Sequence, residues 1–495
     1  MRLFSVFAPI KIFFYVQFYG CNFLFRNIPF IGLLFWPFEI LALPRIMSTK
    51  GARLRKLLVS LGPTFIKFGQ LLSTRPDLVG EQIADELSLL QDELPSFSFR
   101  KVEKIIKQET GKNVLDLFKE FIPEPVAAAS IAQVHKAITQ DDKVVAVKIL
   151  RPGIRRKFNR EISLLYMLAS FVNCFSRLRR LRLKEVVRMF DNTVRQELNL
   201  RLEAAGAHKL AENLKSNNNI VIPGVYWSLT SNRVLVSDWL EGTKITKLKG
   251  RSKKELKEIG DNLVICYYEQ AYRDGYFHAD LHPGNILITK DNKIGLIDFG
   301  IMGSLSQADR LSVAQIVHGF IKRDYDYVAK IHKTAGYIPR DTNLDEFSLA
   351  CRSIGEPIFG QNAQDISIAK LLAQLFLITE SFGMQTQPQL LLLQKTLILI
   401  EGVGAQLNPE LNMWALGEPW MKDWAKENLS AKAIAKYKLE EARDLICELP
   451  LMFQNAKELL ETLNEAGRKK SNKKGACFFT YGIVCGMTAM LLILL

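Results

Sequence analysis

Hydrophobic residues follow two different periods along this chain, and the change between them predicts where helices and strands lie. Between residues 50 and 125 they recur every three or four positions, as at Ile83 and Leu87, and this spacing is typical of amphipathic helices. Helical character returns later and then dominates the C-terminal half. The later helical ranges are 156–176, 184–215 and, apart from one short hairpin, most of the chain beyond residue 253.

Short runs with strand character separate these helices and predict a small sheet. The runs 131–138 and 143–150 are rich in β-forming residues and flank the turn-forming residues 140–142, so we expect a β-hairpin there. Similar runs occur at 220–227 and 233–240, and a second small hairpin is expected at 286–297. A mostly β lobe of five strands with inserted helices, followed by a helical lobe, predicts an α+β fold with two lobes.

The C-terminal end has the pattern of a membrane anchor. Residues 476–495 carry no charge, and at about 1.5 Å per residue they span a hydrocarbon core of about 30 Å. Five Lys and Arg residues lie just before them, within 468–475, and the positive-inside rule then keeps the rest of the protein on the cytoplasmic side. A buried C-terminal helix is the alternative. Gly482 and Gly486 fit the small-xxx-small face of a homodimer.

The sequence does not decide whether two other apolar segments contact lipid or pack on the protein. Residues 1–42 hold ten of the thirty Phe residues, but charged residues and prolines interrupt each apolar run. We expect this segment to lie in a membrane interface or to pack on the protein. Residues 388–407 are also strongly apolar. Most of that range is expected to be core, with lipid contact by one face as the alternative.

The net charge of the chain is concentrated near its ends. The 495 residues include 66 Lys and Arg against 51 Asp and Glu, which leaves +15, and such an excess suggests a polyanionic partner. Residues 1–70 contribute +8 and residues 468–474 another +5, so the middle of the chain is nearly neutral. This distribution favours an anionic membrane surface and argues against nucleic acid. The seven cysteines form no C-x-x-C pair, so neither a disulfide framework nor a zinc knuckle is expected.

The residues that indicate chemistry are densest between 277 and 300. Asp280 is followed five positions later by Asn285, and Asp298 opens a D-F-G triplet after a short hairpin. Phosphoryl transfer needs such a set, because one carboxylate orients the nucleophile while an amide and a second carboxylate hold Mg²⁺ against the phosphates. The order D-x-x-x-x-N, hairpin, D-F-G is that of a kinase catalytic loop.

A lysine upstream fits the same chemistry. Lys148 ends the sequence Val-Ala-Val-Lys in the second strand of the predicted hairpin, where kinases place the lysine that contacts the α- and β-phosphates. Its acidic partner is expected on the helix that follows, and Glu197 and Glu203 are both candidates. No G-x-G-x-x-G precedes Lys148. Instead Ala127, Ala128, Ala129 and Ser130 lead into the first strand, and their small side chains let backbone N–H groups approach phosphates.

These residues, with several others, carry a resemblance to a known family. The chain resembles the UbiB family of atypical protein-kinase-like proteins, also called AarF-like, over about residues 50–420. The motifs that carry it are Lys67-Phe68-Gly69-Gln70 with Ser73, Arg75, Pro76 and Asp77; Ala127–Ser130 with Gln133-Val134-His135; Lys148; Arg151-Pro152-Gly153; Glu197 with Glu203; His278–Asn285; and Asp298–Gly300.

The resemblance implies a role for each site residue. Lys148 then contacts ATP phosphates and pairs with Glu197, and Asp280 is the catalytic aspartate. Asn285 and Asp298 bind Mg²⁺. The K-x-G-Q segment folds over the site and puts Lys67 and Gln70 where a peptide substrate lies in other kinases. This chain departs from the family pattern at three positions, Ala132, Asn199 and Leu281. Because Asn199 is uncharged and stands where the family usually has an acidic residue, a charged contact from position 199 to Lys67 is not expected.

The resemblance also implies ATP or ADP as ligand, Mg²⁺ as cofactor and a membrane setting. We therefore expect an ATPase or small-molecule kinase of the bacterial inner membrane that supports ubiquinone biosynthesis, with lipids, isoprenoid quinone precursors and other quinone-biosynthesis enzymes as partners. An ordinary protein kinase and a non-catalytic nucleotide- and lipid-binding scaffold are the alternatives. His278-Ala279-Asp280 lacks the arginine that reads an activation-loop phosphate, and no A-P-E follows Gly300, so a protein-substrate platform is not expected.

The expected domains follow from these patterns. They are an aromatic-rich membrane-interface segment (1–49), a helical extension with the K-x-G-Q motif (50–125), a kinase-like N-lobe with inserted helices (126–242), a helical C-lobe with the catalytic loop and D-F-G (243–467), a basic juxtamembrane run (468–475) and a transmembrane helix (476–495).

Overall fold

The structure of the protein is a computed structural model. It describes residues 12, 14–24, 48–73, 79–90, 95–173, 183–359 and 387–428, with isolated positions 371, 372, 374, 375, 378, 381–383, 435, 439, 443, 454 and 457. The chain divides into two compact units, Met1–Glu418 and Pro419–Leu495. The first unit contains all the site residues discussed below. The predicted basic run 468–475 and membrane span 476–495 lie outside the described residues.

A five-stranded sheet forms the N-lobe, with the order β1-β3-β4-β6 and with β2 also paired to β3. All of its pairings are antiparallel. Burial alternates along β3 and β4, as expected for a sheet that packs one face on a core. The strands are β1 (Phe118–Phe121), β2 (Ala127–Ala128), β3 (Ala132–Thr139), β4 (Val144–Leu150) and β6 (Val234–Asp238).

The predicted hairpin 131–150 is present as β3 and β4, joined through Asp142 with φ 59°. The helix that covers this sheet was not expected in the N-lobe. Helix α8 (Phe99–Thr110) buries Val102, Ile105 and Ile106 against β4 and β6. Strand β1 also falls inside the range 50–125, which the sequence predicts as helical. The four residues of β1 bury only their two ends, and so short a strand shows no readable period.

Two further elements differ from the sequence prediction. The range 184–215 is not one helix but two, α11 (Leu183–Glu197) and α12 (Leu200–Asn213). The break occurs at Asn199, whose side chain accepts a hydrogen bond from the N–H of Arg201 at 3.2 Å and caps α12. Of the predicted strand 220–227, only β5 (Ile220–Val221) is a strand, and it joins a different sheet.

Two small sheets in the C-lobe flank the loops that carry the predicted site residues. One has the order β5-β10-β9-β7, and the other pairs β8 with β11. The predicted hairpin 286–297 is present as β9 and β10. The strands are β7 (Thr243–Lys244), β8 (Tyr276–His278), β9 (Ile286–Ile288), β10 (Ile294–Leu296) and β11 (Met302–Ser304), and the helices are α13 (Lys253–Tyr268), α14 (Gln307–Ile321), α15 (Tyr325–Thr334), α16 (Leu344–Phe359), α18 (Pro388–Leu407) and α19 (Met413–Asn428).

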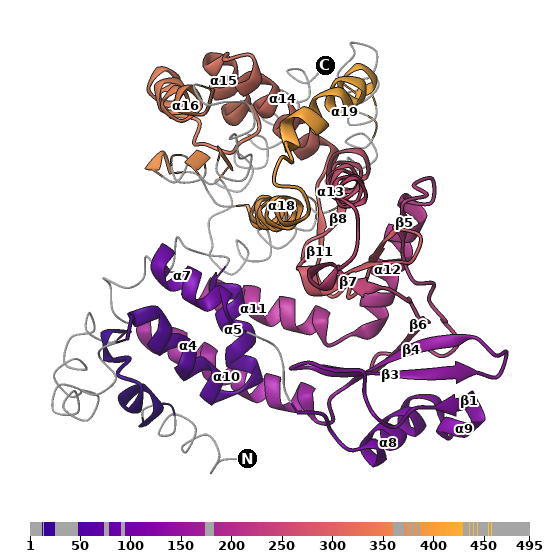
Figure 1. Ribbon diagram of the computed structural model, residues 1–495. Coiled ribbons are helices and arrows are strands. Elements are labelled where there is room, and N and C mark those ends of the chain that lie inside the picture. The colour runs from indigo at the N-terminus through magenta and orange to yellow at the C-terminus, as the bar shows by residue number, and fades with distance from the viewer. Residues whose placement is uncertain are drawn as a thin grey trace. The chain divides into compact units, whose positions relative to one another are not determined.

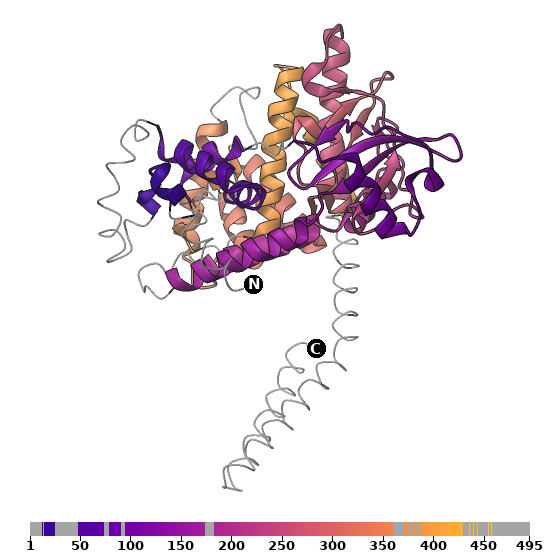
Figure 2. The same ribbon diagram turned by 90° about the horizontal axis from the view of Figure 1, so that it is seen from below.

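Three N-terminal helices pack against helices inserted in the N-lobe, and Figure 1 and Figure 2 show them side by side. They are α4 (Lys50–Leu61), α5 (Pro63–Ser73) and α7 (Glu81–Ser88), and they share one hydrophobic core with α10 (Ile154–Val172) and α11. A Cβ on Gly69 of α5 would lie 2.4 Å from Leu90 and 2.7 Å from Leu58. The glycine of the K-x-G-Q motif therefore permits close helix packing.

Part of the aromatic N-terminal segment packs on these helices. Val16 and Cys21 are buried in the same core, and the Tyr19 and Ser60 hydroxyls are hydrogen-bonded at 2.6 Å. Among the described residues, α18 is the one helix long and apolar enough to cross a membrane. A core helix can have the same length and composition. Helix α18 buries one face along α13, where the Tyr267 hydroxyl donates to the Leu393 carbonyl at 3.1 Å.

Candidate active site

Lys148 lies at the centre of a charged cluster that joins the two lobes. It belongs to β4, between β3 and β6, so its backbone position is fixed on both sides. Its ammonium donates to the Glu203 carboxylate at 2.7 Å and to the Asp298 carboxylate at 2.9 Å. The Lys148 and Glu203 side chains are 16% and 7% exposed. One buried cation therefore holds two carboxylates, one from α12 and one from the D-F-G triplet.

The expected pairing of Lys148 with Glu197 is wrong, because Glu203 occupies that position. Glu197 ends α11 and lies 3.3 Å from the ammonium of Lys67 on α5. The helix break at Asn199 explains the difference, because it starts a new helix whose first turn carries Glu203. From the sequence, Glu197 and Glu203 were both candidates for the partner of Lys148. The helix break at Asn199, which determines that the partner is Glu203, was not predicted.

The charges in this cluster shift one another's ionisation. Burial, aided by the negative charge of Asp298, raises the pKa of Glu203 to about 7, although Lys148 opposes that shift. Loss of surrounding water also opposes ionisation of Asp298, but Lys148 and Lys67 outweigh it and hold the pKa of Asp298 well below its usual range. Burial disfavours the charge on Lys148, yet Asp298 and Glu203 raise its pKa above the ordinary value. The two carboxylates thus differ in how readily they give up their protons.

Asp298 also has an uncommon backbone conformation. Its φ is 61°, in the left-handed region, which costs non-glycine residues about 1 to 3 kcal/mol. Asp and Asn tolerate this region better than other side chains. The conformation accompanies the contact between the Asp298 carboxylate and Lys148, and strain of this kind is concentrated at functional sites.

The catalytic loop is held by hydrogen bonds between its own residues. Asn285 donates through its amide to the carbonyl of Asp280 at 3.0 Å, and its own carbonyl accepts from Ile297 N–H at 3.0 Å. The buried His278 ring accepts from the N–H of Asp280 at 3.2 Å, and burial lowers the pKa of His278. A neutral His278 is therefore part of the scaffold that orients Asp280.

The carboxylate of Asp280 has a partner that the sequence did not indicate. Lys395 of α18 donates to Asp280 Oδ1 at 2.9 Å, and both side chains are 33% exposed. The two residues are 115 positions apart. No local pattern in the sequence indicates this pairing.

The small-residue segment forms strand β2 and the turn that follows it. Ala127 and Ala128 pair with Val134 and Gln133 of β3, and the guanidinium of Arg151 donates to the Ala129 carbonyl at 2.8 and 2.9 Å. Ser130 is fully buried, and its hydroxyl has no hydrogen-bond partner among the described residues. Such a buried hydroxyl suits a polar ligand that approaches the turn.

Helix α5 brings the K-x-G-Q residues to the edge of the cluster. Lys67 is close enough to Asp298 for its charge to lower the pKa of that carboxyl, while its ammonium contacts Glu197. The Gln70 amide donates to the Leu90 carbonyl at 3.1 Å, a contact that ties α5 to the end of α7. Lys67 therefore lies at the site, and Gln70 also joins α5 to Leu90, two positions after the end of α7.

The chemistry of the donor set fits Mg²⁺ held largely by a nucleotide. No group of three or more His, Cys, Asp or Glu residues suited to a metal occurs in the part of the chain that the structure describes. Asn285 uses its amide NH₂ on Asp280, which leaves its oxygen available, and Asp298 provides a carboxylate. Mg²⁺ commonly takes only one or two protein oxygens beside phosphates and water, so a sparse set is adequate.

Comparison with known proteins shows which domain families the chain matches. Residues 89–332 match the ABC1 atypical kinase-like domain, and residues 351–412 match the UbiB helical domain. "Probable protein kinase UbiB" of Pseudomonas fluorescens (strain SBW25) is 39% identical over 85% of this chain and 79% of its own length. The protein of the same name from Marinobacter nauticus is 37% identical over 88% of this chain and 79% of its length.

The chain belongs to the UbiB family.

This membership confirms the resemblance predicted from the motifs, and with it a mixed α+β kinase-like fold with N-terminal helices. A solved structure, the complex of Rv3197 with erythromycin from Mycobacterium tuberculosis, is 24% identical and covers 71% of this chain and 90% of its own, with a TM-score of 0.49. In this UbiB-family chain Lys148, Glu203, Asp298, Asp280 and Asn285 all lie within the ABC1 match. Lys395 lies outside it, in the match to the helical domain.

Proposed function

We propose that this UbiB-family chain binds Mg-ATP at the Lys148–Glu203–Asp298 cluster, acts as an ATPase or small-molecule kinase, and supports isoprenoid quinone biosynthesis at a membrane. The observation that carries the proposal is the pair of contacts from Lys148 to Glu203 and Asp298. A cation shared by two carboxylates at the junction of the lobes is the arrangement that positions a nucleoside triphosphate.

Each site residue takes a definite role in this proposal. Lys148, oriented by Glu203, contacts the α- and β-phosphates, and the backbone and hydroxyl of the Ala127–Ser130 turn face the phosphates. Asn285 and Asp298 hold Mg²⁺, which when bound neutralises phosphate charge. Asp280 orients the attacking hydroxyl or water. Lys67, held by Glu197, lies beside the phosphate site and restricts access by a polypeptide.

The acceptor distinguishes the proposal from its alternatives. The family relatives carry the name "Probable protein kinase UbiB", so transfer to a protein is the second candidate. The position of α5, which brings Lys67 to the cluster, favours water or a small, apolar acceptor over an extended peptide. A scaffold without turnover is the third candidate, and the intact Asp280, Asn285 and Asp298 argue against it.

We predict that cells whose only copy is Asp280→Asn will lose the mature quinone and accumulate a precursor. The substitution keeps the shape of the side chain and removes the group that orients the nucleophile, so the fold should persist while turnover falls. Extraction of quinones and precursors, with quantification by mass spectrometry, is the measurement. Lys330→Met, at an exposed lysine of α15, is the control. An unchanged profile in the Asp280→Asn cells removes the pathway from the proposal.

The membrane anchor is a separate part of the proposal. We predict that truncation after Glu465, which removes residues 466–495, releases the protein from membranes at high salt. The uncharged run 476–495 supplies hydrophobic anchoring, whereas the basic charges at residues 1–70 supply only salt-sensitive attraction. Fractionation of the full-length and truncated proteins in high salt is the measurement. Retention of the truncated protein on membranes would instead assign anchoring to residues 1–42 or to α18.

A further inference from the structure

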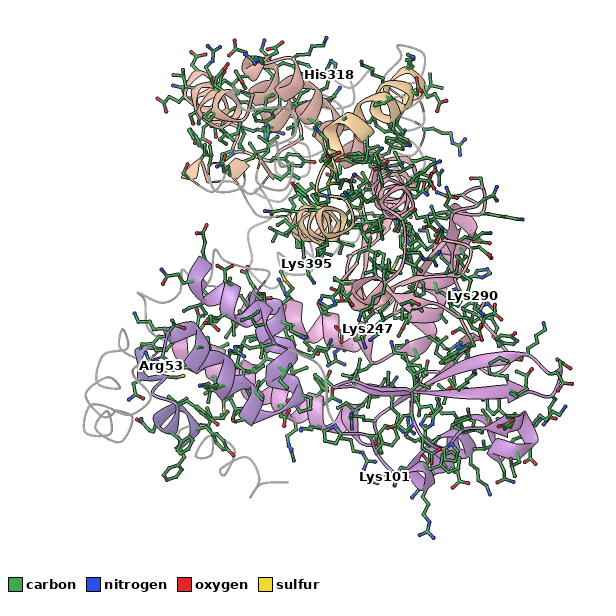
Figure 3. The ribbon with its side chains drawn as sticks, in the orientation of Figure 1. Arg53, Lys101, Lys247, Lys290, His318 and Lys395 are labelled. Atoms are coloured by element: carbon green, nitrogen blue, oxygen red, sulfur yellow. The ribbon has the colours of Figure 1, made fainter. Side chains whose placement is uncertain are left out.

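The carboxylate of Asp280 is held by a cation from a helix far away in sequence. The ammonium of Lys395 donates to Asp280 Oδ1 at 2.9 Å, and Figure 3 labels Lys395 where it leaves α18. Within the catalytic loop, the hydrogen bonds from His278 and Asn285 reach the backbone N–H and carbonyl of Asp280, not its carboxylate. Lys395 is thus the charged contact that the structure gives this carboxylate.

Helix α18 presents Lys395 from a fixed position. Its opposite face buries Leu393, Leu397 and Ile400 in the C-lobe, and the Tyr267 hydroxyl of α13 donates to the Leu393 carbonyl at 3.1 Å. A helix held in this way cannot shift without disturbing the core. The packing of α18 therefore fixes the backbone of Lys395, from which its side chain reaches Asp280.

The face of α18 around Lys395 is otherwise apolar. Residues at helical spacing on either side of it are Leu391, Leu392, Ile398 and Leu399, all partly exposed. The acidic residue of α18, Glu401, lies six positions on and so points to another side of the helix. Lys395 has no acidic residue of its own helix on this face, so no carboxylate of α18 competes with Asp280 for its ammonium.

We propose that the helical domain completes the active site: Lys395 is a positioning residue that fixes Asp280 Oδ1 and leaves Oδ2 directed at the attacking hydroxyl or water. The inference rests on the proposed function, because it assumes that Asp280 orients a nucleophile. It extends that function beyond the kinase-like match, which ends at residue 332, to the helical-domain match at 351–412. Without the ammonium the carboxylate can rotate about its side-chain bonds, and small misplacements of a catalytic group are costly.

The test uses the full-length protein with Lys395→Met, Lys395→Arg and the control Lys330→Met. We expect Lys395→Met to lower kcat for Mg-ATP turnover by about 10- to 100-fold and to leave the Kd for nucleotide unchanged, because the phosphate-binding residues are untouched. Lys395→Arg keeps the charge and should recover most of the rate. Thermal unfolding of each variant checks that the fold is intact. An unchanged kcat in Lys395→Met, or a loss that Lys395→Arg does not restore, overturns the inference.

A second measurement separates positioning from an independent effect. In the Asp280→Asn background, adding Lys395→Met should lower the rate no further, because the group that Lys395 positions is already gone. A further loss of the same size in the double variant overturns the proposal that Lys395 acts through Asp280. Equal turnover by the wild type and Asp280→Asn refutes the proposed function itself, whereas a slow Asp280→Asn together with a normal Lys395→Met refutes only the role of Lys395.

Discussion

Asp298→Asn is expected to lower the rate of Mg-ATP turnover strongly while the fold is retained. Asn tolerates the left-handed backbone of position 298, where φ is 61°, as well as Asp does, so the substitution adds little strain. It removes the carboxylate proposed to hold Mg²⁺, and the phosphate charge near the site is then poorly neutralised. The loss of one such preorganised charge typically lowers kcat by about 100- to 1000-fold.

Steady-state ATP hydrolysis at several Mg²⁺ concentrations is the measurement for this variant. The apparent affinity for Mg²⁺ in the presence of nucleotide should fall together with kcat. Lys148 keeps its contact with Glu203 at 2.7 Å, so thermal unfolding without ligand should change little. Asp309→Asn, at an aspartate of the first turn of α14, controls for the loss of a negative charge elsewhere. Turnover equal to the wild type in Asp298→Asn would refute the proposed phosphate chemistry.

Lys148→Met is expected to destabilise the protein as well as to prevent nucleotide binding. The substitution leaves the carboxylate of Glu203, 7% exposed, without its cation. Removing one partner of a buried ion pair typically costs about 3 to 5 kcal/mol. The double variant Lys148→Met/Glu203→Gln carries no unpaired charge at position 203, although Asp298 still lacks its contact with Lys148, so it should recover part of the lost free energy of unfolding.

The destabilisation by Lys148→Met should depend on pH in a defined direction. The pKa of Glu203 in the folded wild type is already raised to about 7 by burial, and loss of Lys148 raises it further. The folded state of the variant then holds a proton that the unfolded state releases above about pH 4.5, so the variant loses stability as pH rises. The wild type shares this loss up to about pH 7, and the difference in stability between the two proteins grows above that value. Urea unfolding at about pH 5 and about pH 8 is the measurement. A loss independent of pH would show that Glu203 is not the cause.

A matched control for this pair of experiments lies on the neighbouring strand. Lys136 of β3 contacts the Trp239 ring, with 4.9 Å between its ammonium and the ring centroid, and pairs in the sheet with Ala146 of β4. Lys136→Met removes a lysine from the same sheet without exposing a buried carboxylate. Its effect on unfolding should stay near 1 kcal/mol or less, the usual strength of such a cation–π contact.

The sequence identified the residues of the site better than their contacts. Spacing along the chain singled out Lys148, Asp280, Asn285 and Asp298 as candidates, because the strand, the loop and the D-F-G triplet are each local patterns, and the structure brings Lys148 to Asp298 and Asn285 to Asp280. The hairpins around them were also predicted, since their alternation and turn residues lie within a few positions. These features depend on neighbours in sequence, which is why sequence alone can specify them.

The contacts that were missed depend on helix ends and on packing across the fold. A single capping residue, Asn199, separates Glu197 from Glu203 and sends the first to Lys67 and the second to Lys148. Strand β1 was too short to show a period. The pairing of Lys395 with Asp280 spans 115 positions and follows from the packing of α18 on α13, which no local pattern encodes.

The shared core of the N-terminal helices and the inserted N-lobe helices has a consequence for motion. Helices α4, α5 and α7 are joined to α10 and α11 by one continuous set of buried residues, which also includes Leu150 at the end of β4. Such a packed set moves as a rigid body. Under the proposed function, a hinge rotation of the N-lobe away from the catalytic loop would carry Lys67 and Lys148 together, and release of nucleotide would then coincide with the opening of the acceptor path.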